Sequence, residues 1–246
     1  MAKNRLLLLS NSQNRTELYL GHAESTIKDF LGEQTKKVLF IPYARVLPSF
    51  DEFTSKVRES FQRMGYEVDP IHRRLNLHKA IREAQAIVIG GGNTFHLLEH
   101  LYERDLINSI RASVKSGIPF IGWSAGANVA CPTIMTTNDM PIVQLPSFAA
   151  LDLVGFQINP HYPDFETVDG NTETREERIV EFNEINPGMY VVALREGSFL
   201  RVEEQKIELT GKLGARIFIK GKEPVDYESG ESLRFLLQEQ KELCPA

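Results

Sequence analysis

Short apolar segments alternate with amphipathic segments along the first half of the chain. Five short segments are typical of strands, the third being the weakest: 5–10, 37–43, 66–71, 86–89 and 119–123. Between them, apolar residues recur at spacings of three and four, as at Phe50, Phe53, Val57 and Phe61. This spacing is typical of helices, which we expect at 25–31, 49–64, 77–84, 94–102, 105–116 and from Ser124 to about Ala130.

This order of elements predicts an α/β fold. Strands that are apolar throughout are buried on both faces, which is typical of a parallel sheet with helices on either side. We therefore expect a doubly wound, mostly parallel sheet. In such folds ligands bind beyond the carboxyl ends of the strands, so polar residues that directly follow a predicted strand are the first candidates for a functional site.

The second half of the chain is less regular. It predicts strands at 157–159, 189–194, 199–203, 206–209 and 215–219, with a helix at 174–182. The segments 199–203 and 206–209 are close enough to form a hairpin. Because no Pro-, Gly- or Ser-rich linker divides the chain, we expect a single domain over 1–246.

Composition and charge narrow the class of protein. The net charge is −5 and no Lys/Arg stripe stands out, which argues against a nucleic-acid partner. The apolar runs are too short for a membrane span, and Leu6–Leu9 is too short for a signal peptide and fits a buried first strand. The two cysteines, Cys131 and Cys244, lack metal-site spacing and favour a reducing cytoplasm. We expect a cytoplasmic protein, monomer or homodimer, without metal or cofactor.

The most specific candidate for chemistry is Gly122-Trp123-Ser124-Ala125-Gly126, between a predicted strand and a predicted helix. This context is typical of a nucleophile elbow, in which a tight turn exposes a serine hydroxyl and leaves room only for small neighbours. The start of the following helix directs its N–H groups at the reacting carbonyl, so the Ala125 N–H is a candidate oxyanion donor. The five-residue pattern alone also occurs by chance; its strand–helix context favours the elbow.

A second glycine-rich segment, Gly90-Gly91-Gly92-Asn93, also follows a predicted strand. Three glycines allow close approach of a ligand to the backbone, and Gly92 N–H is the candidate second oxyanion donor. An ordinary strand-to-helix turn and a nucleotide-binding loop are the alternatives. The chain lacks Gly-x-Gly-x-x-Gly here and lacks the Lys-Ser/Thr of a phosphate loop, which disfavours the nucleotide.

A serine nucleophile requires a base and a group that orients the base. Among six histidines, His161 follows a predicted strand and is braced by Pro160 and Pro163, which predicts a stiff loop at the active edge. The orienting carboxylate is expected at a strand end as well, where Glu196 is favoured over its rivals Asp139 and Asp164.

Taken together, several segments resemble the α-aspartyl dipeptidase (peptidase E) family. The matching segments are 7–12 (Leu-Leu-Leu-Ser-Asn-Ser), 90–95 (Gly-Gly-Gly-Asn-Thr-Phe), 121–132 (Ile-Gly-Trp-Ser-Ala-Gly-Ala-Asn-Val-Ala-Cys-Pro), 136–143 (Thr-Thr-Asn-Asp-Met-Pro-Ile-Val), 157–161 (Gln-Ile-Asn-Pro-His) and 173–176 (Glu-Thr-Arg-Glu). The resemblance implies hydrolysis of dipeptides with an N-terminal aspartate by a Ser-His-Glu triad, on a fold similar to class I glutamine amidotransferases. Ser124 and His161 match directly; the family's Pro-Glu-Gly-Asn reads Arg195-Glu196-Gly197-Ser198 here.

A dipeptide with a free amine and a side-chain carboxylate requires a cation and an anion close together. Arg175 offers a planar fork for the carboxylate, although a salt-bridged helix residue is the alternative, given Glu173, Glu176 and Glu177 nearby. Asp139 is the candidate for the substrate ammonium, and Asn93 and Asn138 could add hydrogen bonds.

Two other functions stay open at this point. A cyanophycinase-like peptidase acting on β-linked aspartyl polymers would use a similar serine elbow; the segments around Arg175 and 136–143 favour the dipeptidase. A non-catalytic amino-acid or peptide sensor would keep the glycine-rich pocket without needing a serine–base pair. The presence of Ser124, His161 and Glu196 favours an enzyme with a small peptide substrate.

Overall fold

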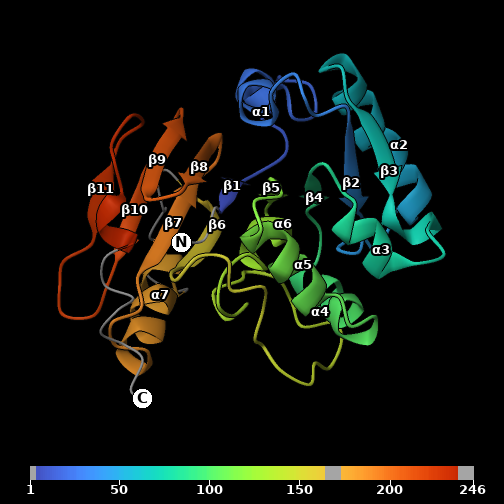
Figure 1. The fold of residues 1–246 in the computed structure, drawn as a ribbon. Helices are drawn as coiled ribbons and strands as arrows, with labels where there is room; N and C mark the ends of the chain where they lie inside the picture. The colour runs from blue at the N-terminus through green and yellow to red at the C-terminus, as the bar shows by residue number, and fades with distance from the viewer. Residues whose placement is uncertain (1–3, 164–172, 238–246) are drawn as a thin grey trace.

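A computed structural model describes residues 4–163 and 173–237, which form two β-sheets with flanking helices (Figure 1). The larger sheet has seven strands in the order β3-β2-β4-β5-β1-β8-β9. Its parallel strands are β1 (Arg5–Leu9), β2 (Lys37–Ile41), β3 (Glu67–Pro70), β4 (Ile87–Ile89) and β5 (Phe120–Trp123). The hairpin β8 (Ser198–Glu203) and β9 (Lys206–Gly211) extends it, with β8 antiparallel to β1.

Helices cover both faces of this sheet. One face packs against α1 (Glu24–Leu31) and α2 (Phe50–Arg63). The other packs against α3 (Leu77–Arg82), α4 (Thr94–Glu103), α5 (Ile107–Lys115) and α6 (Ala125–Asn128). Short 3₁₀ turns are η1 (Gly21–Ala23), η2 (Ile71–Arg73) and η3 (Arg234–Leu237).

The first strand shows why the parallel strands are apolar throughout. Side chains alternate between the faces of a strand, so Leu7 and Leu9 pack with α1 and α2, whereas Leu6 and Leu8 pack with the helices on the opposite face. All four leucines are fully buried. The predicted buried first strand is therefore confirmed, together with the doubly wound α/β class.

The smaller sheet has four strands in the order β11-β10-β7-β6. They are β6 (Gln157–Tyr162), β7 (Val191–Arg195), β10 (Ala215–Phe218) and β11 (Val225–Tyr227). Strands β6 and β7 are parallel, and the remaining pairs are antiparallel. Helix α7 (Arg175–Ile185) packs on it through Ile179. The chain passes from this sheet to the larger one at the turn between β7 and β8.

The structure differs from the sequence predictions at several element ends, in one further strand and in the number of sheets. The helix after Ser124 ends at Asn128, the strand predicted at 157–159 continues to Tyr162, and β11 was not predicted because its residues are mostly exposed. The division into two sheets was not predicted either, because apolar patterns do not specify which strands pair. The single domain over 1–246 stays a prediction. Within the ranges described, no helix is long and apolar enough to cross a membrane.

Candidate active site

Ser124 lies at the turn from β5 into α6, where it is the residue before the first helical position. Its backbone has φ 54° and ψ −113°, a conformation that residues other than glycine rarely adopt. Its N–H donates to the carbonyl oxygen of Leu9, the last residue of β1, at 3.0 Å. The neighbouring strand thus helps to hold the strained turn that presents the serine side chain.

The two glycines of the elbow are required by packing. A Cβ on Gly122 would lie 2.4 Å from the carbonyl oxygen of Gly126, and a Cβ on Gly126 would lie 2.2 Å from that of Ile89. Both distances are far below van der Waals contact with carbon. The Gly-x-Ser-x-Gly pattern therefore reflects close packing of α6 against the ends of β4 and β5.

His161 brings the two sheets together at this site. Its Nε2 lies 2.9 Å from Ser124 Oγ, and its Nδ1 lies 3.0 Å from Glu196 Oε1. The prediction of a loop after the strand was wrong, because His161 lies within β6. It has φ 56°, where the pairing with β7 shifts register between Asn159 and Tyr162. Pro160 has no N–H for the ladder, and such irregularities are tolerated on an edge strand such as β6.

Glu196 occupies the short turn between β7 and β8, followed by Gly197 with φ 76°. Its side chain is 55% exposed. The rival Asp139 lies elsewhere: its Oδ2 accepts from the backbone N–H of Thr94 at 2.7 Å, at the start of α4. Between these two carboxylates, the one in contact with His161 is Glu196. The other rival, Asp164, lies outside the described residues.

The glycine-rich turn after β4 lies against the elbow. A Cβ on Gly91 would lie 3.0 Å from Ser124 Cβ, and one on Gly92 would lie 2.2 Å from the Ala44 carbonyl oxygen. Within residues 4–163 and 173–237, the N–H groups of Gly91, Gly92 and Ala125 donate no hydrogen bond. These amides, in the turn of Ser124 and in the glycine-rich turn against it, are therefore able to donate to a ligand.

The predicted asparagines belong to the framework around the site. Asn93 Oδ1 accepts from the N–H of His96 and caps α4, while its Nδ2 donates to the carbonyl of Met140. Asn138 Nδ2 donates to the carbonyl of Pro160 at 3.0 Å. Asn138 therefore supports the segment that carries His161, and both amides already have partners in the described chain.

Arg175 is the first residue of α7, whose start is closed by a capping box between Thr174 and Glu177. Its Nη1 donates to the backbone carbonyl of His161. Two acids of the salt-bridge alternative are engaged elsewhere, since Glu173 pairs with Arg178 and Glu177 accepts from Thr174. The structure thus brings a guanidinium next to the histidine.

The other reactive side chains considered in the sequence, Cys131, His96 and His100, make none of the contacts described above for Ser124, His161 and Glu196. Complete burial raises the pKa of the Cys131 thiol to about 12, so it stays protonated and unreactive. The rings of His96 and His100 are 4.4 Å apart, yet the described part of the chain contains no group of three ligand side chains placed to hold a metal ion.

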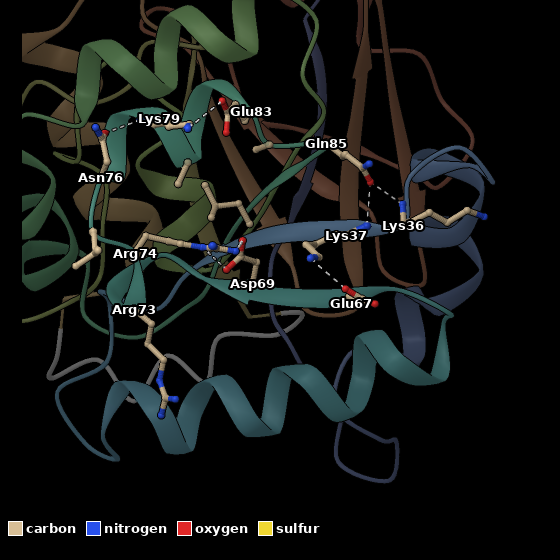
Figure 2. Close-up of a pocket in the computed structure, with 14 residues that line it drawn as sticks. Lys36, Lys37, Glu67, Asp69, Arg73, Arg74, Asn76, Lys79, Glu83 and Gln85 are labelled. Carbon is tan, nitrogen blue, oxygen red and sulfur yellow. Dashed lines mark hydrogen bonds and ion pairs between the residues drawn. The ribbon is translucent and has the colours of Figure 1, made fainter.

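A surface pocket of about 710 Å³ lies beside β2, β3 and α3 (Figure 2). It is lined by residues of β2, β3 and α3 and by the segment between β3 and α3. Its charged groups are largely paired, Arg74 with Asp69 and Lys37 with Glu67. None of the predicted site residues lines it, so it is not part of the candidate active site.

Sequence reasoning missed two polar residues at the site, Ser10 and Asn11, which directly follow β1. Ser10 Oγ accepts from the N–H of His161, and Asn11 Oδ1 accepts from that of Gly197. The rule that identified Ser124, polar residues at the carboxyl end of a buried strand, could have found them.

Comparison with known proteins places this geometry in a family. The model of peptidase family S51 matches residues 6–210. The chain is 50% identical over 234 residues to peptidase E of a Nostoc species, covering 95% of this chain and 97% of that protein. It is 44% identical over 232 residues to peptidase E of a Shewanella species, covering 94% and 98%.

A solved structure has the same fold. The crystal structure of a peptidase from an actinobacterium superposes with a TM-score of 0.69 at 19% identity, covering 94% of this chain and 97% of that one. The matched residues of the family include the elbow, the histidine strand and the glutamate turn. The chain therefore belongs to peptidase family S51 and is a serine-type peptidase.

Proposed function

We propose that this peptidase hydrolyses dipeptides with an N-terminal aspartate, with Ser124 as nucleophile, His161 as general base and Glu196 as the group that orients the base. The observation that carries the triad is the placement of one imidazole between two partners, 2.9 Å from Ser124 Oγ and 3.0 Å from Glu196 Oε1. This is the geometry that activates a serine and fixes the tautomer of its base.

The reaction follows from these contacts. His161 Nε2 takes the proton of Ser124 as Oγ bonds to the substrate carbonyl carbon, and the N–H groups of Gly92 and Ala125 stabilise the oxyanion. The C–N bond then breaks and His161 returns the proton to the leaving amine. Water, deprotonated by the same imidazole, next attacks the acyl carbon; the C–Oγ bond breaks, His161 returns the proton to Ser124 Oγ, and aspartate is released. Glu196 stabilises the His161 imidazolium during both acylation and deacylation.

The contacts of Arg175 and Asp139 support the assignment of the substrate groups. Arg175 donates to the His161 carbonyl, so its guanidinium lies beside the proposed base, and it is the proposed partner of the substrate β-carboxylate. Asp139 accepts hydrogen bonds through Oδ2, and its Oδ1 accepts none within the described ranges, which leaves an oxygen for the substrate ammonium. Asn93 and Asn138 are the proposed polar neighbours of the bound dipeptide.

We further propose a cytoplasmic location and a monomer or homodimer. The location is supported by the buried, unpaired Cys131, because proteins that keep free thiols are typical of reducing compartments. Cell fractionation tests the location, and light scattering of the purified protein tests the assembly.

The function is tested with a panel of dipeptides, Asp-X, Glu-X, Asn-X and β-linked Asp-X, by measuring the free amino acid released. We expect Asp-X to be cleaved fastest, and Ser124→Ala to lose activity by several orders of magnitude while remaining folded. Equal cleavage of Glu-X or Asn-X would contradict the proposed pocket. Preference for the β-linked peptide would favour the cyanophycinase-like alternative, and binding of Asp-X without hydrolysis would favour a sensor.

A further inference from the structure

Ser10 lies where the two sheets meet. It directly follows β1 of the larger sheet and is fully buried. Its N–H donates to the carbonyl of Ser198 at 3.0 Å, and its Oγ donates to the carbonyl of Leu194, the residue before the last in β7, at 2.8 Å. The same Oγ accepts the backbone N–H of His161 at 2.8 Å. One small side chain thus connects β1, β6 and β7.

This connection links the proposed base to the proposed nucleophile by a short path. The carbonyl of Leu9, one residue before Ser10, accepts the N–H of Ser124 at 3.0 Å. Two consecutive residues therefore hold the backbones of Ser124 and His161, which are 37 positions apart in the chain. A change at Ser10 would alter the position of one sheet relative to the other at the site itself.

The backbone of His161 depends on this contact more than an ordinary strand residue would. Its φ of 56° is unfavourable for a non-glycine residue. The regular pairing of β6 with β7 is interrupted between Asn159 and Tyr162, so the ladder does not fix His161. Its carbonyl accepts from Arg175 and its N–H donates to Ser10. Side chains therefore hold both backbone polar groups of His161.

Asn11 makes the corresponding contact to the acid. It is 2% exposed, and its Oδ1 accepts the N–H of Gly197, directly after Glu196, at 2.7 Å. Its Nδ2 donates to the Asn14 side chain at 3.0 Å, which anchors the amide. The segment after β1 thus contacts the backbone beside both partners of the proposed relay.

From these contacts we propose that Ser10 is a positioning residue of the peptidase reaction. Its hydroxyl fixes the backbone of His161, and through it the imidazole, relative to Ser124. This inference rests on the proposed triad. Because a displacement of about 1 Å in a reacting group can lower the rate about 100-fold, loss of the hydroxyl is expected to act on turnover rather than on substrate affinity.

The test compares Ser10→Ala with Ser60→Ala, using the best-cleaved dipeptide. Ser60, which lies on α2, is a matched control. It is 1% exposed, and its hydroxyl donates to the carbonyl of Tyr19 at 2.9 Å. We expect Ser10→Ala to lower kcat about 10- to 100-fold with KM changed less than about threefold. Melting temperatures of the two variants should be similar. Ser10→Thr, which keeps the hydroxyl, should recover most of the loss in kcat.

A second measurement avoids the dipeptide altogether. The rate at which a fluorophosphonate labels Ser124 depends on proton transfer to His161, so it should fall in Ser10→Ala and not in Ser60→Ala. Values of kcat and labelling rate within about threefold of the Ser60→Ala values would overturn the inference. If Ser10→Ala does not fold, Ser10→Cys replaces it, because a thiol is a weaker hydrogen-bond acceptor than a hydroxyl. Its kcat and labelling rate are compared with those of Ser60→Ala in the same way.

Ser124→Ala separates this inference from the proposed function. If Ser124→Ala keeps its hydrolytic activity, the proposed function fails and the positioning role fails with it. If Ser124→Ala is inactive and Ser10→Ala behaves like Ser60→Ala, only the positioning role of Ser10 is overturned.

Discussion

Glu196→Gln isolates the charge of the proposed orienting acid. The amide has nearly the same shape and can still accept from His161 Nδ1, which lies 3.0 Å from Glu196 Oε1. What is lost is the attraction between the carboxylate and the imidazolium that forms as Ser124 loses its proton. The variant therefore reports on stabilisation of the transition state, and we expect KM to change little.

The exposure of the Glu196 side chain sets the size of the expected loss in kcat. Two unit charges 4 Å apart interact by about 1 kcal/mol in water and by about 4 kcal/mol at the intermediate dielectric of a protein surface. The Glu196 side chain is 55% exposed, so water screens the pair and the loss should fall between these limits. We take about 1.4–2.7 kcal/mol, which lowers kcat about 10- to 100-fold. A buried acid would cost far more.

The assay is steady-state hydrolysis of Asp-X, with Glu103→Gln as the matched control. Glu103 is 56% exposed and its Oε2 lies 3.2 Å from His100 Nδ1, so it forms the same type of pair away from Ser124. Glu103→Gln should leave kcat unchanged. Asp139→Asn should mainly raise KM. If Asp139→Asn lowers kcat more than Glu196→Gln does, the carboxylate roles proposed here are wrong.

Three further changes test the framework around the site. Gly126→Ala places a methyl group 2.2 Å from the Ile89 carbonyl oxygen, so it should lower the free energy of unfolding by about 1–3 kcal/mol and lower kcat; urea titration and kinetics that match wild type would contradict the packing argument. The Cys131 pKa is raised to about 12, so above about pH 9 only the unfolded thiol ionises and stability falls as pH rises. The fall in the free energy of unfolding between pH 8 and pH 10 should be smaller in Cys131→Ala than in the wild type, as measured by urea unfolding. An equal fall in both proteins would show that the Cys131 thiol does not cause it. Ser49→Ala removes the capping box with Glu52 and should cost about 1 kcal/mol of stability, seen as a lower Tm, without changing kcat.

Local interactions explain what could be predicted from the sequence. A fully buried parallel strand needs apolar residues on both faces. The run Leu6–Leu9 therefore identified β1, and similar apolar runs identified the neighbouring strands, without knowledge of the fold. The elbow was also accessible, because the clash that requires Gly122 is with Gly126 of the same turn, although the clash that requires Gly126 is with Ile89 at the end of β4. Sequence alone thus determined the sheet class, the helices on its faces and the serine turn.

The tertiary structure decided how distant segments meet. It places His161 within β6 of a second sheet, and it brings Glu196 rather than Asp139 into contact with the imidazole. Ser10 and His161 are 151 positions apart, and their hydrogen bond depends on how the two sheets pack together. Patterns of apolar residues specify which face of a strand is buried. They do not specify which strand ends adjoin across two sheets, because that depends on packing between elements far apart in the chain.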